Sequence, residues 1–243
     1  MGTAVWNAVQ NDPGLELVGC IDPSAVGQLL GGHTVLASLD ELDVTPEVVI
    51  DFTVAAAAVA TMEWCVDHHV HVVVGTTGLD SAWLAGLGEK AHANGTGVLV
   101  AANFAIGAVL MMRLSEIAAP FFESVEIIEE HHNTKKDAPS GTALVTAERI
   151  AAVSGEWGSD PTEHELLPGA RGATTAEGIT IHSLRVKGLV AHQEVVFGTT
   201  GQTLRIRHDS LNRESFMPGI VRAAAWIPTH PGLTLGLESV LGL

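Results

Sequence analysis

The first hundred residues alternate short, almost wholly apolar runs with helical segments, and this alternation allows very few folds. The apolar runs are expected to be strands, at residues 15–21, 48–53, 71–74 and 97–101. The segments between them are expected to be helices, at residues 3–10, 54–68 and 81–93. Apolar strands joined by helices form parallel sheets that are covered on both faces. Because such crossovers are right-handed, the sequence predicts a Rossmann-like, doubly wound α/β domain.

The pattern changes after residue 103 to that of an α+β domain with a mixed, open sheet. A strand is expected at 124–130 and a helix at 140–153, followed by a loop at 154–177 that is rich in Gly, Pro, Asp and Thr. Three strands with short, glycine-containing links come next, at 180–186, 192–197 and 203–207. A last helix is expected at 213–226. We therefore predict one domain from residues 1–103 with 213–243, and a second from residues 104–212.

The sequence begins where the first helix of a Rossmann domain would begin. Such domains open with a central strand and a glycine-rich turn, and here Met1 and Gly2 stand where that turn would end. Without the central strand, its two neighbours would each have an unpaired edge. Two explanations remain open: a start assigned too far downstream, or a shortened protein with weakened cofactor binding.

Charge and cysteine content exclude several classes of function. A net charge of -16 argues against binding to nucleic acid or to an anionic membrane, because both need a basic surface. The longest apolar stretch, residues 98–112, is interrupted by Asn103 and Gly107 and is short for a membrane span. Cys20 and Cys65 are two isolated cysteines, which suggests reduced thiols and a cytoplasmic protein.

The strongest chemical signal lies in residues 130–143. Two of the four lysines of the chain, Lys135 and Lys136, are adjacent here and follow His131 and His132 closely. This is a local cationic cluster in a strongly acidic protein. Such a cluster suits a small anionic substrate that must also receive a proton.

Each of these residue types has a specific use. Adjacent strand residues point to opposite faces, so His131 and His132 are expected to have different roles. Lys135 can donate a proton at neutral pH if its pKa is lowered. Ser140 is a candidate N-cap, and the first-turn amides of Gly141 and Thr142 favour a carboxylate or phosphate. Adjacent histidines also occur on surface loops, and a capped helix need not bind anything.

A metal site is a less favoured interpretation of the same histidines. The chain has no His-Glu-x-x-His motif, no cysteine near them and no third ligand at a standard spacing. The neighbouring lysines also oppose the binding of a cation. We therefore predict no metal.

In the first domain, three segments follow predicted strands at the edge where open parallel sheets bind ligands. Asp22 stands where an acidic side chain commonly accepts hydrogen bonds from a dinucleotide ribose, although an Asp-Pro turn explains it equally well. The other two segments are 75–78 and 101–104, in which small residues let a ring approach the backbone. The sequence therefore predicts a dinucleotide site at this edge.

Residues 130–143 resemble the signature of the dihydrodipicolinate reductase family, the 4-hydroxy-tetrahydrodipicolinate reductases of bacterial lysine biosynthesis. The His-His-x-x-Lys-x-Asp-Ala-Pro-Ser-Gly-Thr pattern is long and specific. The resemblance covers the chain from residue 1 to 243, and the second half is most similar to the actinobacterial branch. The other matching segments are 49–53, 74–78, 101–104, 167–172, 188–194 and 207–210.

The resemblance implies reduction of 4-hydroxy-tetrahydrodipicolinate to tetrahydrodipicolinate by NADH or NADPH, in diaminopimelate and lysine biosynthesis. It makes His131 the catalytic histidine and Lys135 the proton donor, and it implies a homotetramer assembled through the sheet of the second, substrate-binding domain. The implied contacts to the substrate carboxylates are His132, Lys135, Gly141 and Thr142, at the helix that Ser140 caps. The implied cofactor contacts are Asp22 near the adenine ribose and Gly75, Thr76, Thr77, Ala101, Ala102, Asn103 and Phe104 near the nicotinamide.

The chain departs from the family pattern at its beginning. The family opens with a strand and a Gly-x-x-Gly-x-Met-Gly turn, of which only Met1 and Gly2 are present. Pyrophosphate binding by that turn therefore cannot be assigned, and no basic residue follows Asp22 closely, which favours NADH. Two other functions were weighed: a non-catalytic module that binds the dicarboxylate alone, and an aspartate or homoserine dehydrogenase. The complete signature at 135–142 argues against the second.

Overall fold

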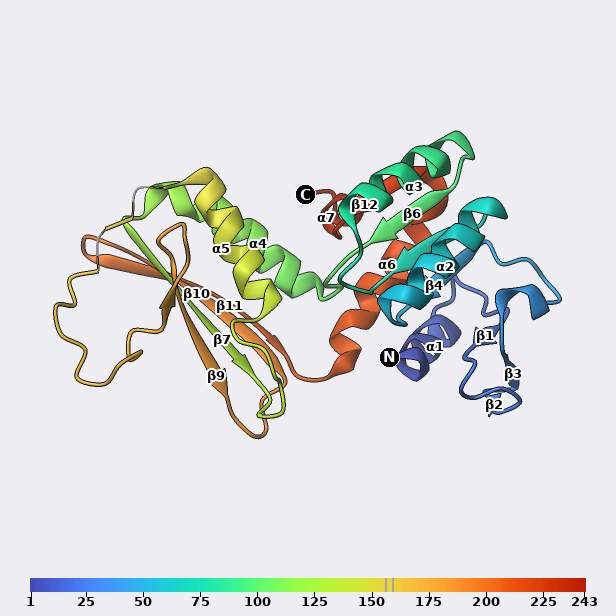
Figure 1. The fold of residues 1–243 in the computed structure, drawn as a ribbon, viewed down its shortest axis with the longest axis horizontal. Helices are drawn as coiled ribbons and strands as arrows, with labels where there is room; N and C mark the ends of the chain where they lie inside the picture. The colour runs from blue at the N-terminus through green and yellow to red at the C-terminus, as the bar shows by residue number, and fades with distance from the viewer. Residues whose placement is uncertain (156, 159) are drawn as a thin grey trace. The chain divides into compact units, whose positions relative to one another are not determined.

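A computed structural model of the chain describes residues 1–155, 157–158 and 160–243. The chain forms two compact units, shown in Figure 1. Unit 1 comprises Met1–Phe104 and Phe216–Leu243, and unit 2 comprises Ala105–Ser215. The predicted roles of the two domains, dinucleotide binding in the first and substrate binding with oligomerisation in the second, stay predictions.

Unit 1 is built on a parallel sheet in the order β12-β6-β5-β4. These strands are Gly232–Leu235, Gly97–Val100, His71–Val74 and Val48–Asp51, respectively. Val72, Val73 and Val74 are all fully buried, so the central strand is covered on both faces. This explains why the strand has no alternation of polar and apolar residues.

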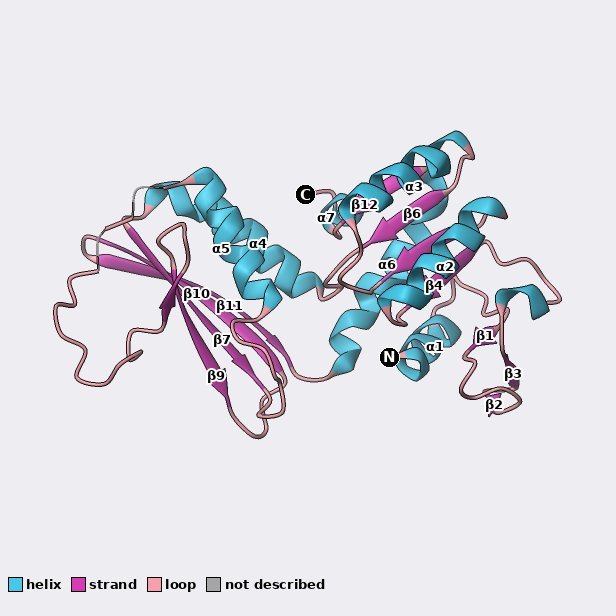
Figure 2. Ribbon diagram, in the orientation of Figure 1, coloured by secondary structure: helices cyan, strands magenta, loops and turns pink. Residues whose placement is uncertain are grey.

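Helices cover both faces of this sheet, as Figure 2 shows. On one face, α2 (Ala55–Asp67) and α3 (Ser81–Ala93) pack against the strands around Met62, Leu84 and Val98. On the other face, α6 (Met217–Trp226) contacts β4 and β5, and α1 (Gly2–Asn11) packs on α6. The remaining helical segments of the unit are η1 (Leu39–Glu41), η4 (Ile227–Thr229) and α7 (Glu238–Leu241).

The strand predicted over residues 15–21 is wrong for most of its length. Only β1 (Cys20–Ile21) is a strand, and it pairs in parallel with β3 (His33–Leu36), which pairs on its other side with β2 (Leu29–Leu30). Among the described residues, nothing pairs with the outer edges of β1 and β4, so the sheet is divided into a three-stranded and a four-stranded part. The extended conformation of residues 15–19 therefore has no ladder to stabilise it.

Unit 2 contains a five-stranded mixed sheet in the order β11-β10-β7-β9-β8. The central strand β7 (Ser124–His131) is antiparallel to β10 (Ala191–Thr199) and parallel to β9 (Thr180–Arg185). The outer strands are β11 (Gln202–Ser210) and the short β8 (Ala173–Thr174). The link from β10 to β11 is a tight turn in which Gly201 has a φ of 77°, a conformation that glycine adopts without strain.

One face of this sheet is covered by α4 (Ile106–Ala118) and α5 (Gly141–Val153), with the short η2 (Ala119–Phe121) after α4. Ile127, Ile150, Val195 and Phe197 form part of the core beneath them and are fully buried. Side chains alternate along β7, so Val125, Ile127, Glu129 and His131 share the helix-covered face. Glu129 thus places a carboxyl group at the edge of an apolar core.

The structure differs from the sequence-based prediction at two further places, both near the C-terminal end of the chain. The helix predicted over residues 213–226 is two elements, η3 (Arg213–Phe216) and then α6, because Pro218 has no N–H and fits only the first turn of an α-helix. Strand β12 was not predicted from the sequence. Its four residues complete the edge of the parallel sheet beside β6.

The packing of α3 on β12 generates a stability prediction. A Cβ added at Gly88 would lie 2.7 Å from Cβ of Leu233, whereas one at Gly86 would meet nothing within 4 Å. We expect Gly88→Ala to lower the free energy of unfolding by roughly 1–3 kcal/mol through overpacking. The matched change Gly86→Ala should raise it by about 0.5–1 kcal/mol, because alanine loses less backbone entropy on folding. Urea denaturation of both variants measures the difference, and equal effects would contradict the packing.

Candidate functional site

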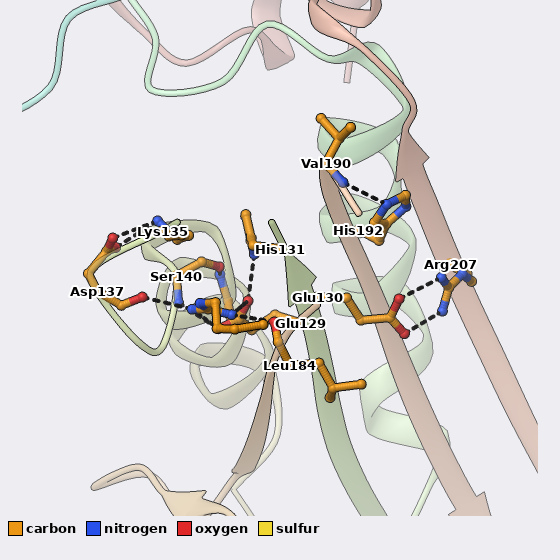
Figure 3. Close-up of polar contacts among 12 residues, drawn as sticks. Glu129, Glu130, His131, Lys135, Asp137, Ser140, Leu184, Val190, His192 and Arg207 are labelled. Atoms are coloured by element: carbon orange, nitrogen blue, oxygen red, sulfur yellow. Dashed lines mark hydrogen bonds and ion pairs between the residues drawn. The ribbon is translucent and has the colours of Figure 1, made fainter. Parts of the chain in front are cut away.

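The cation-rich segment connects the end of the central strand of unit 2 to the beginning of a helix. Strand β7 ends at His131, and α5 begins at Gly141, so residues 132–140 form a loop between the two elements. Figure 3 shows the side chains around this loop. The structure therefore gathers His131, Lys135 and Ser140 at one end of the sheet.

Glu129 lies at the centre of this region and is fully buried. One of its oxygens, Oε2, accepts hydrogen bonds from Nδ1 of His131 at 2.6 Å and from Nη1 of Arg185 at 2.9 Å. The other, Oε1, accepts from Nη2 of Arg185 at 2.8 Å and from the backbone N–H of Ser140 at 3.2 Å. One carboxylate thus joins β7, β9 and the start of α5.

The ionisation of Glu129 follows from these contacts. Burial by itself raises the pKa of a carboxyl group, but the hydrogen bonds from His131, Arg185 and Ser183 outweigh it and lower the pKa of Glu129 to about 2. The side chain is therefore a carboxylate at neutral pH. An ionised carboxylate only accepts hydrogen bonds, so the Nδ1 atom of His131 must carry the proton in this contact.

Lys135 forms an ion pair with Asp137 on the same loop. Its Nζ donates to both carboxylate oxygens, at 2.8 Å each, and the hydrogen bond from Lys135 lowers the pKa of Asp137. The side chain of Lys135 is 20% exposed and that of Asp137 is 63% exposed. Because the carboxylate of Asp137 is largely exposed and water screens the pair, Lys135 can exchange this partner for another anion.

His132 has a different set of partners from His131. Its Nδ1 lies 2.7 Å from Oγ1 of Thr134, and its backbone N–H donates to the carbonyl of Val190 at 3.4 Å. The N–H of Val190 in turn donates to Nε2 of His192 at 3.2 Å, and Nδ1 of His192 lies 2.6 Å from Oδ1 of Asp209. The two adjacent histidines therefore belong to separate hydrogen-bond networks.

The N-terminus of α5 has a side-chain cap and open space beside it. The hydroxyl of Ser140 accepts from the N–H of Ala143 at 3.2 Å. The N–H groups of Gly141 and Thr142 lie in the first turn, where no intrahelical acceptor exists. A Cβ added at Gly141 would meet nothing within 4 Å. An anion can therefore approach these two amides, and the helix dipole favours it there.

In unit 1, the loops after β4, β5 and β6 lie side by side at the carboxyl ends of the strands. The N–H of Gly75 donates to the carbonyl of Asp51, and the hydroxyl of Thr76 donates to the carbonyl of Thr53 at 3.2 Å. The N–H of Ala101 donates to the carbonyl of Val74. Thr77 and Ala102 are exposed beside these bonds, and Asn103 is half-buried.

Gly75 leaves room for the ring of Phe52, which packs against its backbone. A Cβ at Gly75 would lie 2.0 Å from the ring of Phe52, which in turn packs against Phe104 with 5.4 Å between ring centroids. The sequence predicted that a cofactor ring approaches the backbone here, and at Gly75 the ring of Phe52 occupies that place. At Gly78, by contrast, an added Cβ would meet nothing within 4 Å.

Asp22 follows β1 directly and is exposed. Its Oδ1 accepts from the hydroxyl of Ser24 at 2.6 Å and from the Ser24 N–H at 2.9 Å, and these bonds lower the pKa of Asp22. The turn that the sequence offered as an alternative explanation is therefore present. Because the turn uses Oδ1, the exposed Oδ2 can still accept from ribose hydroxyls, so the residues of this edge fit a dinucleotide.

No helix in the described part of the chain has both the length and the apolar character needed to cross a membrane. No group of three or more His, Cys, Asp or Glu side chains within residues 1–155, 157–158 and 160–243 is arranged to hold a metal ion.

Sequence reasoning missed three residues of this region, namely Glu129, Arg185 and His192. Glu129 and His131 are two residues apart on a strand and so share a face, which was the available signal for the first. Arg185 lies on another strand, opposite His131 in the register, and only the pairing of β7 with β9 brings it close. His192 lies opposite Glu130 for the same kind of reason.

A Rossmann-like unit with an acidic residue after β1, together with a cationic loop and an open helix N-terminus on a second unit, is the arrangement of a two-domain, nucleotide-dependent oxidoreductase. Comparison with known proteins specifies the family. Residues 1–104 match the family description "Dihydrodipicolinate reductase, N-terminus", and residues 107–241 match "Dihydrodipicolinate reductase, C-terminus". The chain belongs to the dihydrodipicolinate reductase family.

Individual relatives agree with this assignment. The chain is 55% identical over 205 residues to the 4-hydroxy-tetrahydrodipicolinate reductase of Thermobifida fusca, covering 81% of this chain and 82% of the relative. It is 47% identical to that of Cutibacterium acnes, covering 100% of this chain and 95% of the relative. The predicted family, NAD(P)H-dependent oxidoreductase activity and use of NADH or NADPH are thereby confirmed.

Solved structures agree with the fold. A dipicolinate-bound dihydrodipicolinate reductase from Paenisporosarcina sp. TG-14 superposes with a TM-score of 0.89 at 40% identity, covering 98% of this chain and 94% of that one. An amine dehydrogenase from Mycobacterium smegmatis shares the fold alone, with a TM-score of 0.64 at 14% identity, over 96% of this chain and 91% of that one. The predicted α/β fold class is confirmed.

The lowered pKa of Glu129 predicts how stability depends on pH. A carboxyl whose pKa falls from 4.5 in the unfolded chain to about 2 in the folded one contributes stability above pH 4.5. That contribution is on the order of 3 kcal/mol, and it is lost as the pH falls toward 2. In urea unfolding, the destabilisation caused by Glu129→Gln should therefore shrink from pH 5 to pH 3. A difference that stays constant over this range would contradict the role of the ionised carboxylate.

Proposed function

We propose that this chain reduces 4-hydroxy-tetrahydrodipicolinate to tetrahydrodipicolinate with NADH or NADPH, in diaminopimelate and lysine biosynthesis. One observation carries the proposal. A protonated ring nitrogen, a lysine and an open helix N-terminus are gathered at one end of the sheet of unit 2, at the segment that bears the family signature. The relative from Paenisporosarcina sp. TG-14 is bound to dipicolinate, which supports a small dicarboxylate as the substrate.

The substrate carboxylates are assigned to the loop and the helix that follows it. The amides of Gly141 and Thr142, in the turn that Ser140 caps, would receive one carboxylate. His132 and Lys135 would contact a carboxylate from the loop. Cationic and N–H donors that converge on a dianion also bind the negative charge that develops on the ring during reduction, which is where stabilisation increases the rate.

Lys135 is the assigned proton donor. In the free enzyme it is held by Asp137, in an exposed pair that a substrate anion can replace. His131, held by Glu129 through Nδ1, leaves its Nε2 edge for the reacting region. Lys135 would deliver the proton to the ring nitrogen or to its enamine tautomer, and His131 would support that transfer.

The cofactor is assigned to the carboxyl-end loops of unit 1. Asp22 would accept hydrogen bonds from the adenine ribose, and the loop of Thr76, which is buried, and Thr77, which is exposed, would hold the nicotinamide side. Gly75, Ala101, Ala102, Asn103 and Phe104 form the remainder of this assignment. The bound nicotinamide supplies the hydride. Assembly as a homotetramer and a cytoplasmic location are further expectations of this proposal.

The role of Lys135 is tested by its replacement with alanine. Lys135→Ala should lower kcat about a hundredfold or more, because a charge that acts in the transition state is lost. The Kd for NADH, measured by fluorescence titration, should stay within about twofold of the parent, since the residue lies in unit 2. The matched control is Lys136→Ala, which removes the adjacent exposed lysine and should retain most of the activity. Unchanged turnover in Lys135→Ala would discard the assignment, and absence of NADH binding by the parent would favour a non-catalytic dicarboxylate-binding module.

The open space beside Gly141 gives a second test. Gly141→Ala meets no protein atom within 4 Å, and alanine favours the helix, so the free energy of unfolding should be unchanged or higher by up to about 1 kcal/mol. The new methyl group would occupy the approach to the first-turn amides. KM for the dicarboxylate should therefore rise about tenfold or more, while KM for NADH stays constant. An unchanged KM for the dicarboxylate would move the carboxylate site away from the α5 N-terminus.

A further inference from the structure

Glu129 is the residue of unit 2 whose contacts the proposed reaction does not explain. It is fully buried, so it is not available to bind substrate, and yet its carboxylate is ionised. Its donors include Nδ1 of His131, both Nη atoms of Arg185 and the backbone N–H of Ser140. Each of these donors belongs to, or adjoins, a part of the site assigned above.

The contact with His131 determines the protonation pattern of the imidazole. The carboxylate accepts at 2.6 Å, so Nδ1 carries a proton whether the ring is neutral or charged. In the neutral ring, Nε2 is then the atom with the lone pair, and this atom can take up or pass on a proton. Without the carboxylate, nothing in this contact would select that tautomer or that ring orientation.

Arg185 extends the same arrangement to the loop that carries Lys135. Its two Nη atoms donate four hydrogen bonds, two to Glu129, one to the carbonyl of Leu184 and one to the carbonyl of Asp137 at 2.7 Å. Asp137 is the ion-pair partner of Lys135 and lies two residues after it. The guanidinium thus ties the backbone of the lysine loop to the buried carboxylate.

We propose that Glu129 and Arg185 are positioning residues for this reductase: Glu129 selects the Nδ1–H form and the orientation of His131, and Arg185 holds the loop that presents Lys135. The proposal rests on the proposed function, because the two residues act through His131 and Lys135 and not on the substrate. Among the described residues, no other buried polar group has contacts that connect the ring of His131 with the loop of Lys135.

A matched control exists on the same strand. Glu126 also accepts hydrogen bonds from a histidine and an arginine, His182 at 2.7 Å and Arg171 at 2.5 Å. It lies on the opposite face of β7 from Glu129, because the two positions are three residues apart. Glu126→Gln therefore makes the same chemical change, in the same kind of cluster, away from His131 and Lys135.

The first experiment measures the tautomer of His131 by the ¹⁵N and ¹³C chemical shifts of its ring. In the parent, Nδ1 should be protonated. In Glu129→Gln, the amide oxygen should occupy the position that accepts from the Ser140 N–H and from Nη2 of Arg185, because an N–H₂ there would face two donors. The N–H₂ then faces the ring, so Nδ1 should become the acceptor and Nε2 should carry the proton. Glu126→Gln should leave the parent pattern unchanged. A parent ring with an unprotonated Nδ1, or a variant ring unchanged from the parent, would overturn the proposal.

The second experiment separates kcat from KM. Glu129→Gln should lower kcat by about tenfold or more, within the range of lost acid–base assistance, with KM for the dicarboxylate changed less than about threefold. Arg185→Lys keeps the charge but has only three N–H donors and no fork, so it should lower kcat and raise KM together, by about fivefold or more each. Kinetic constants of Arg185→Lys equal to those of the parent would overturn the role of Arg185.

The outcomes distinguish this inference from the proposed function. A parent that does not reduce the dicarboxylate would contradict the proposed function, while the ring shifts of the parent would still decide whether Glu129 sets the tautomer. If Glu129→Gln does not fold, the parent shifts and the Arg185→Lys kinetics remain decisive. Loss of activity equal in Glu126→Gln and Glu129→Gln would indicate a general structural effect and would overturn the proposal.

Discussion

The end of the unit 2 sheet that carries the family signature depends on one buried carboxylate. Moving a carboxylate and a guanidinium out of water costs several kcal/mol per ion, and their attraction compensates only when the geometry is good and the remaining hydrogen bonds are made. Glu129 meets that condition through donors on both of its oxygens, whereas the Nε of Arg185 is buried and has no hydrogen-bond partner among the described residues. The contacts of Glu129 connect β7, β9 and the start of α5 through one carboxylate. They restrict the movement of the three elements and of the loop 132–140 between β7 and α5.

In the proposed function, the two units bind their anionic ligands by different physical means. Unit 1 uses the edge of a parallel sheet, where loops after β4, β5 and β6 offer exposed backbone and Asp22 offers a carboxylate to hydroxyl groups. In the proposed function, unit 2 would use the charge of Lys135, which would exchange Asp137 for a substrate carboxylate, and the helix dipole and first-turn amides of α5. A dianionic ring requires the second arrangement, since its charge must be balanced as it changes.

The two incorrect expectations about strands share a cause, which is that a strand is stabilised by its neighbours. Residues 15–19 have the composition of a strand but lack a partner among the described residues, and only Cys20 and Ile21 pair, with β3. Conversely, β12 has an unremarkable sequence and becomes a strand because β6 offers an edge to it. The helix at the end of the chain begins late for a local reason, the position of Pro218, which was readable in advance.

The sequence by itself determined the class of both units and the cluster of residues 131–142, because strand and helix periodicity and adjacent motif residues are local properties. It also indicated that His131 and His132 would have different roles, since side chains alternate along a strand. Their nearest side-chain partners, Glu129 and Thr134, are local in the sequence, and only the tertiary structure decided which distant residues the two hydrogen-bond networks reach. Arg185 and His192 are 54 and 61 residues from His131 in the chain, and the pairing of β7 with β9 and β10 brings them together. Such pairings depend on the summed packing of the whole sheet and not on any segment of the chain.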